Sequence, residues 1–362
     1  MRLVFCLLLA LCAAVSARAQ DDTGPPFVGT PPWQTLELGP RAHRYPFPVY
    51  ASRTLTADNL AHIEHVVVIV HGVKRDAGHY YETAAGLLWM DPPALENTLV
   101  IAPKFAGTID RGFERMPAWH RDRWIGDGES VKAAGRPAPI SSFDVLDDLL
   151  EWLANRGTLP ALTDIVLAGH SAGAQMVQRY AVLNDIDETV RKRGIDVRYI
   201  VANPSSYLYF TTDRPRGDGG FGPYNRGLCP DFNDFRYGLD HLPHGIRAQD
   251  RLRLASRYAS RAVSYLLGGA DTNPEHRWLD KRCGAEAQGA TRLSRGRAYL
   301  RYEAWLPALK HNIHQAWEVV GVGHDQRGMF GSECGARALL GPDAKTTPGA
   351  ASCVAPAGIK GP

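Results

Sequence analysis

The sequence has no marked excess of charge of either sign. Its 362 residues include 41 lysines and arginines and 38 aspartates and glutamates, which leaves a formal net charge of +3. Binding to nucleic acid usually requires a clear basic excess on a domain, so this balance argues against a nucleic-acid partner. The sequence also has no internal repeat. With 44% hydrophobic and 22% charged residues, the chain has enough apolar side chains for a large core.

Long hydrophobic runs are scarce as well. The apolar run Leu3–Val15 is shorter than the roughly 20 residues that a membrane-spanning helix needs. Arg2 precedes this run and the small-residue site Ala17-Arg18-Ala19 follows it, which is the pattern of a secretory signal peptide. We therefore expect a signal peptide over 1–19, with an uncleaved anchor as the alternative, and a flexible leader over 20–32. The mature protein is expected to be soluble, without a membrane span, and secreted or periplasmic.

Cysteine is sparse, with six in the whole chain. Two of them fall in the predicted signal peptide, and an even number in an exported protein predicts two disulfides among the other four. Three pairings are possible. We favour Cys229–Cys283, which would hold down a long insertion, and Cys334–Cys353, which closes a short loop. The spacings CxxC and HxxxH do not occur, so we expect no metal site.

Strand-like and helix-like segments alternate from residue 33 onward. Short alternating segments within 33–55 predict antiparallel strands, and the β-branched run His65–Val70 is typical of a strand covered on both faces. Further strands are expected at 98–102, 164–168, 197–202, 262–267 and 317–322, and helices at 142–155, 175–183, 288–310 and 326–340. This alternation predicts an α/β fold with a mainly parallel sheet.

Residues 203–250 interrupt the alternation of strands and helices. They are rich in glycine, proline, asparagine and aromatic residues. Loops of this length inside a compact domain are usually functional. We therefore expect a single domain over 33–362 with a lid-like insertion at about 203–250.

The segment Gly169-His170-Ser171-Ala172-Gly173 follows a predicted strand and opens a predicted helix. This is the G-x-S-x-G pattern in the context that gives it meaning. A serine on so sharp a turn exposes its hydroxyl. The strand and the helix pass so close together that the residue two positions before the serine and the residue two positions after it cannot have bulky side chains. Ser171 is therefore the predicted nucleophile.

A serine hydroxyl needs a base, and the base needs a carboxylate that fixes its tautomer. His324 directly follows the last predicted strand, where a base is expected, so we predict that it takes the serine proton. Asp271 lies at the end of the strand-and-turn segment that comes one strand before His324, and it is the predicted acid. The alternatives for the acid are three further aspartates, Asp213, Asp240 and Asp280.

An acyl-transfer intermediate carries an oxyanion, which backbone N–H groups stabilise. One donor is expected at Ala172, at the start of the helix, where the helix dipole also favours negative charge. The second is expected at Val73, in the loop His71-Gly72-Val73 that follows the first buried strand.

With HG after one strand, GHSAG after another, and Asp and His after the last two, the sequence resembles the α/β-hydrolase superfamily over about residues 65–330. The resemblance implies a mostly parallel eight-stranded sheet with helices on both faces, a Ser-His-acid triad and hydrolysis through an acyl-enzyme. Within the superfamily the chain is most similar to secreted esterases and polyhydroxybutyrate-depolymerase-like serine hydrolases. This narrower similarity rests on the leader, the disulfides and the segment GGADTNPEHRWLD.

Four aromatic residues are expected near the catalytic edge of the sheet because they lie in loops that follow predicted strands. These side chains would form an apolar wall for a substrate, with packing inside the loops as the alternative. They are Trp119, Trp124, Tyr207 and Tyr209.

Together these features predict an exported serine hydrolase that cleaves small or polymeric carboxylic esters without a cofactor. An amidase or peptidase, or a polymer depolymerase, with the same triad is the alternative among enzymes. A non-catalytic secreted binding protein on a hydrolase scaffold is the alternative from another class. The sequence does not determine the oligomeric state.

Overall fold

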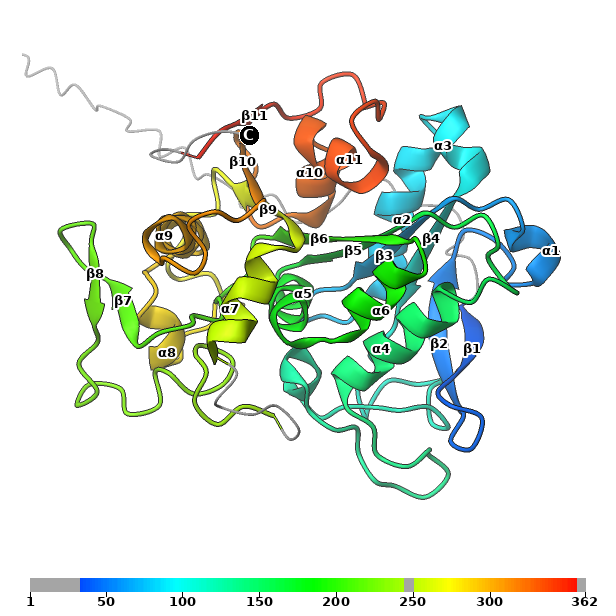
Figure 1. Ribbon diagram of the computed structural model, residues 1–362, viewed down its shortest axis with the longest axis horizontal. Coiled ribbons are helices and arrows are strands. Elements are labelled where there is room, and N and C mark those ends of the chain that lie inside the picture. Colours follow the sequence, from blue (N-terminus) through cyan, green and yellow to red (C-terminus); the bar gives the residue numbers. More distant parts are fainter. Residues whose placement is uncertain (1–32, 244–250, 357–362) are drawn as a thin grey trace, which may run out of the picture. The chain divides into compact units, whose positions relative to one another are not determined.

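A nine-stranded sheet forms the centre of the protein in a computed structural model that describes residues 33–243 and 251–356. The predicted signal peptide, the predicted leader and residues 244–250 of the predicted insertion lie outside the described residues. The sheet order is β1-β2-β4-β3-β5-β6-β9-β10-β11 (Figure 1). The strands are β1 (Gln34–Leu38), β2 (Tyr45–Ala51), β3 (His65–Val70), β4 (Thr98–Pro103), β5 (Asp164–His170), β6 (Asp196–Ala202), β9 (Ala262–Gly268), β10 (Gln315–Val319) and β11 (Cys353–Val354).

Six neighbouring strands, from β4 to β10 in the sheet order, are parallel. The antiparallel pair β1 and β2 extends one edge, as residues 33–55 predicted, and β11 adds an antiparallel strand at the other edge. The sheet thus has one strand more than the eight that the family resemblance implied. The extra strand contains Cys353, whose disulfide to Cys334 holds the C-terminal segment beside β10.

Helices cover both faces of the sheet (Figure 1). Side chains along each strand alternate between two cores: Val66 and Val68 of β3 face one, and Val67 and Ile69 face the other. This two-sided burial explains why the parallel strands are continuous apolar runs. The first core packs against α4 (Ser142–Leu153), α5 (Ala172–Leu183), α7 (Arg251–Ala259) and α9 (Arg292–Trp305), and the second against α2 (Ala77–Leu88), α10 (Gln326–Phe330) and α11 (Glu333–Leu340).

The predicted helices are present, but most of them begin or end at other residues than predicted. Helix α4 begins where the sequence predicts because the Ser141 hydroxyl accepts hydrogen bonds from the amides of Phe143 and Asp144. The helix predicted at 326–340 is two helices, since Ser332 caps α11 after a break at Gly331. Shorter helices, which the sequence did not indicate, are α1 (Ala57–Leu60), α3 (Pro92–Asn97), η1 (Arg123–Gly126), α6 (Ile186–Lys192) and α8 (Cys283–Glu286).

The described part of the predicted insertion contains the two-stranded sheet of β7 (Asp213–Pro215) and β8 (Phe221–Pro223). A disulfide joins this segment to the start of α8, with the Cα atoms of Cys229 and Cys283 5.8 Å apart. Both favoured cysteine pairs are therefore formed in the structure. Among the described helices, none combines the length and the apolar character that crossing a bilayer requires.

Candidate active site

Ser171 lies at the turn between β5 and α5, with φ 58° and ψ −118°. Positive φ is unfavourable for a residue with a side chain, and such strain is concentrated at functional sites. Helices α2 and α5, which follow the neighbouring strands β3 and β5, pack on opposite faces of the sheet. The ends of these two strands therefore flank a crevice, which is where ligands bind in open α/β sheets.

The two glycines around Ser171 allow the close approach that this turn requires. A Cβ atom at Gly169 would lie 2.4 Å from the carbonyl carbon of Gly173. A Cβ atom at Gly173 would lie 2.3 Å from the carbonyl oxygen of Val70 in β3. Both distances are too short for any side chain, so the spacing of the sequence motif has a direct steric cause.

The structure brings Ser171, His324 and Asp271 together in one hydrogen-bonded chain. His324 Nε2 lies 2.8 Å from Ser171 Oγ, and His324 Nδ1 lies 2.8 Å from Asp271 Oδ2. The three residues follow the carboxyl ends of β5, β10 and β9, and parallel strands place these ends at one edge of the sheet. The alternative acids Asp213, Asp240 and Asp280 make no hydrogen bond or ion pair to His324 within the described residues.

Buried polar side chains hold the hydrogen-bonded residues Ser171, His324 and Asp271 in place. The sequence analysis did not identify these side chains. Arg292 donates from Nη1 to Asp271 Oδ1 at 3.3 Å and from Nε to Ser205 Oγ at 2.8 Å. Asn203, which follows β6 with φ 48°, donates to the Gly323 carbonyl at 3.0 Å and accepts from the Gly268 amide at 2.6 Å. Asn203 thus joins the loops that precede Asp271 and His324. The only local signal for it is its place directly after a strand.

Two further histidines surround the His324 ring. The ring centroids of His170 and His324 are 4.7 Å apart, and those of His276 and His324 are 5.1 Å apart. Tyr80 fixes the first of these rings, since its hydroxyl lies 3.1 Å from His170 Nδ1. These contacts leave the His324 imidazole little freedom to turn away from Ser171.

The electrostatics of the site favour a neutral imidazole. Burial lowers the pKa of His324 well below the ordinary 6.5, and the positive charges of Arg292, His276 and Lys74 act in the same direction. Burial raises the pKa of the Asp271 carboxyl, which Arg292 opposes. A neutral His324 at physiological pH can accept a proton, as a general base must.

We expect Arg292→Met to move the acid side of the pH profile of kcat/KM upward by about one pH unit. Removing the positive charge raises the pKa of Asp271 and of His324, so His324 becomes protonated at a higher pH. The measurement is kcat/KM against pH, with thermal melting to verify folding. Arg292→Lys keeps the charge and should shift the profile less. Profiles that superimpose for wild type and Arg292→Met would show that Arg292 has no such effect.

Two free backbone amides lie beside Ser171. In the described part of the chain, the N–H groups of Val73 and Ala172 have no protein acceptor, and both residues line the same cleft as Ser171. Gly72 leaves room for the Tyr80 hydroxyl, because a Cβ atom at position 72 would lie 2.7 Å from its oxygen. The residues predicted to form an oxyanion hole are therefore placed together, and their role stays a prediction.

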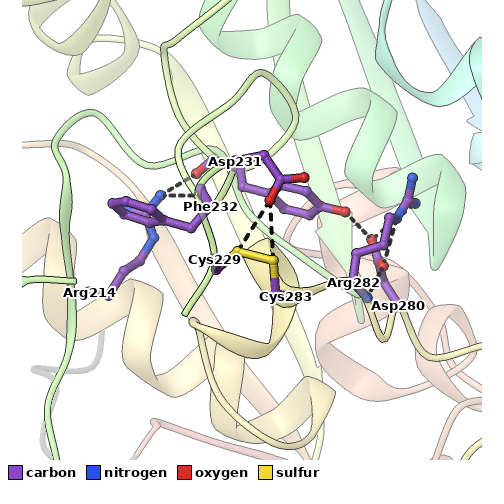
Figure 2. The surroundings of a disulfide bond; sticks show 8 residues. Arg214, Cys229, Asp231, Phe232, Asp280, Arg282 and Cys283 are labelled. Atoms are coloured by element: carbon purple, nitrogen blue, oxygen red, sulfur yellow. Dashed lines mark hydrogen bonds and ion pairs between the residues drawn. A yellow bond between two sulfur atoms is a disulfide. The ribbon is translucent and has the colours of Figure 1, made fainter. Parts of the chain in front are cut away.

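The cleft has a volume of about 480 Å³. One wall is the segment 277–282, which the disulfide Cys229–Cys283 fastens to the insertion (Figure 2). Figure 2 shows Asp280 and Arg282 next to this disulfide, and Asp280 Oδ2 also accepts from the Tyr237 hydroxyl at 2.8 Å. Asp231 lies 3.3 Å from Cys283 Sγ, but the disulfide removes both thiols as metal ligands. A larger cavity of about 710 Å³ begins at the amino ends of the strands and contains none of Ser171, His324 and Asp271.

The four aromatic residues expected to face a substrate are instead fully buried, so this expectation is corrected. Trp124 stacks on Phe105 with ring centroids 5.6 Å apart, and Tyr207 stacks on Tyr299 at 4.5 Å. Their loops follow the expected strands, but the rings turn into the core, where burying large apolar surfaces is most favourable. None of these four aromatic residues lines the cleft. They are Trp119, Trp124, Tyr207 and Tyr209.

A mostly parallel sheet with helices on both faces and a serine at a strained strand-to-helix turn define the α/β-hydrolase fold. Solved structures with this architecture are similar to the chain. A poly(aspartic acid) hydrolase from Sphingomonas sp. KT-1 is 21% identical, with a TM-score of 0.53 over 83% of this chain and 96% of that one. A poly(3-hydroxybutyrate) depolymerase from Bordetella parapertussis is 22% identical, with a TM-score of 0.55 over 87% and 92%. No protein-family model matches the sequence, and no curated protein matches it significantly.

Proposed function

We propose that this protein is an exported serine hydrolase that cleaves carboxylic ester bonds through an acyl-enzyme intermediate. The observation that carries the proposal is the chain of two 2.8 Å contacts from Ser171 through His324 to Asp271. A complete chain of this kind weighs against a non-catalytic binding protein, since loss of catalysis usually removes one of its members. Two disulfides and the pattern of residues 1–19 support export.

In the first half of the proposed reaction, Ser171 Oγ attacks the ester carbonyl carbon while His324 Nε2 takes the hydroxyl proton. The carbonyl oxygen becomes an oxyanion, to which the amides of Val73 and Ala172 donate. Asp271 accepts the hydrogen bond from His324 Nδ1 and stabilises the imidazolium. The tetrahedral intermediate then collapses, the bond to the alcohol oxygen breaks, and His324 gives its proton to the departing alcohol.

In the second half, water replaces the alcohol. His324 takes a proton from water, the hydroxide oxygen bonds to the acyl carbon, and the bond to Ser171 Oγ breaks. The proton returns to Ser171, and a carboxylic acid leaves. No cofactor takes part in these steps, because each proton removed is returned within one cycle.

A substrate panel tests the proposal. We expect the full mature chain to hydrolyse 4-nitrophenyl esters and to be labelled by a fluorophosphonate probe. Peptide 4-nitroanilides distinguish an amidase, and soluble polyesters distinguish a depolymerase. A depolymerase is the second candidate because the two similar structures are a poly(aspartic acid) hydrolase and a poly(3-hydroxybutyrate) depolymerase. If no ester is cleaved and the probe does not react with folded protein, the proposal is wrong.

The dependence on pH follows from the proposed base. Since the pKa of His324 is lowered from 6.5, kcat/KM for a neutral ester should be constant near pH 7. It should fall only at a pH well below 6.5, as protonation removes the base. The measurement is kcat/KM between pH 4 and 9 with a substrate that does not titrate. A fall that begins above pH 7 would contradict the assignment of His324.

A further inference from the structure

Six of the residues that line the cleft with Ser171 are charged, which is unusual for a cleft that takes a neutral ester. Four basic residues line it, namely Arg236, Arg277, Lys281 and Arg282, against two acidic residues, Asp122 and Asp280. Lys74, next to Val73 of the lining, adds a further positive charge that acts on His324. The cleft therefore has an excess of positive charge although the whole chain is nearly neutral.

Ion pairs already engage three of these four basic side chains, and the pair of Lys281 is with Glu275, at 3.2 Å. Asp122 Oδ2 lies 2.6 Å from Arg236 Nη1 and 2.9 Å from Arg282 Nη2, and these two guanidinium groups help to hold the pKa of Asp122 at about 2. Arg282 also bonds to Asp280 at 3.0 Å. The two acids are consequently charged at physiological pH, and both are occupied by the arginines around them.

Arg277 is different. Over the described residues its guanidinium makes no hydrogen bond or ion pair, and it lies over the ring of Trp278, 5.1 Å from the ring centre. The preceding residue, His276, has its ring centroid 5.1 Å from that of His324, and Arg277 itself lines the same cleft as Ser171. Trp278 is 44% exposed although it lines the cleft. An unpaired guanidinium on an exposed aromatic ring is well suited to bind a carboxylate.

The wall that carries Arg277 is held on both sides. Asp271 and its bonds to His324 and Arg292 precede the wall. The disulfide at Cys283 follows it (Figure 2). Within the wall, Arg295 Nη1 donates to the Asp280 carbonyl at 2.9 Å. This frame orders the backbone of the wall, so only the exposed side chain of Arg277 has to be ordered on binding.

We infer that the substrates carry a carboxylate close to the scissile bond, and that the Arg277 guanidinium binds this carboxylate against the face of Trp278. The inference rests on the proposed ester hydrolysis and specifies its substrate class as acidic esters.

Two matched pairs of substrates test the inference. In the first pair the carboxylate is on the acyl side: mono-4-nitrophenyl adipate against 4-nitrophenyl hexanoate, with spontaneous rates subtracted. In the second it is on the leaving group: 3-carboxyphenyl butyrate against phenyl butyrate. We expect wild type to have a higher kcat/KM for the acidic member of at least one pair. This preference should decrease as NaCl is raised from 50 to 500 mM, because salt screens the attraction.

Arg277→Gln should lower the acidic-to-neutral ratio of kcat/KM about tenfold in the preferred pair, and Arg277→Lys should lower it less. The matched control is Arg253→Gln, an exposed arginine of α7 outside the cleft, which should leave the ratio unchanged. A wild-type preference for the neutral ester in both pairs would overturn the inference, as would an equal loss of both rates in Arg277→Gln. Either result would leave ester hydrolysis itself established, whereas a failure of wild type on all four esters would also remove the proposed function.

Discussion

Ser171→Ala is expected to lower kcat for ester hydrolysis by about five to six orders of magnitude, as loss of the nucleophile does when a triad acts as a unit. The variant retains the amides of Val73 and Ala172, so a small residual rate above that in water should persist. Alanine has the same Cβ atom as serine, and the strain at φ 58° is therefore unchanged. The measurement is kcat for a 4-nitrophenyl ester together with fluorophosphonate labelling.

The melting temperature of Ser171→Ala should remain within a few degrees of wild type, since one buried hydroxyl is lost without a change of shape. This control separates loss of chemistry from loss of fold. Labelling of Ser171→Ala at the wild-type rate would show that a different side chain is the nucleophile. His324 would then lack its proposed partner, and the mechanism would have to be rebuilt.

Asp271→Asn should reduce kcat about 10⁴-fold, which is the second of the two largest effects that we expect from single substitutions. The asparagine amide would donate to His324 Nδ1, where the carboxylate now accepts at 2.8 Å. The imidazole would then carry its proton on Nε2, which faces Ser171 Oγ and could no longer take a proton from it. The effect arises from the tautomer, so the position of the ring should change little.

Asp213→Asn is the matched control for this substitution. Asp213 was an alternative acid from sequence, and it lies in β7 outside the cleft lining. Its kcat should remain close to wild type. Near-wild-type turnover in Asp271→Asn, or a large loss in Asp213→Asn, would assign the acid elsewhere.

Much of the fold follows from local patterns. His65–Val70 and the strand before Gly169 could be predicted because parallel strands buried on both faces leave uninterrupted apolar runs. The turn at Ser171 could be predicted because glycine alone fits at positions 169 and 173. The prediction of Asp271 and His324 as its partners used their places after the last two predicted strands and the chain order Ser, Asp, His that is typical of α/β-hydrolases.

Contacts between distant segments account for what the sequence analysis missed. Nothing near Arg292 indicates that its guanidinium reaches Asp271, 21 positions earlier, because that contact depends on how α9 packs beside β9. The loops of Trp124 and Tyr207 follow strands as expected, yet the direction of each ring is set by the core around it. The two-residue strand β11 is too short to have a pattern of its own, and it pairs with β10 beside a disulfide.

The sequence by itself determined the parallel strands of the sheet and the strained serine turn, and it predicted the three residues that meet there, since burial, backbone sterics and strand direction act locally or along one edge. Only the tertiary structure decided which aromatic rings are core, which arginine supports Asp271, and which basic side chain in the cleft has no ion pair among the described residues. Those features depend on side-chain directions and on partners far away in the chain, which pack together only when the whole domain has folded.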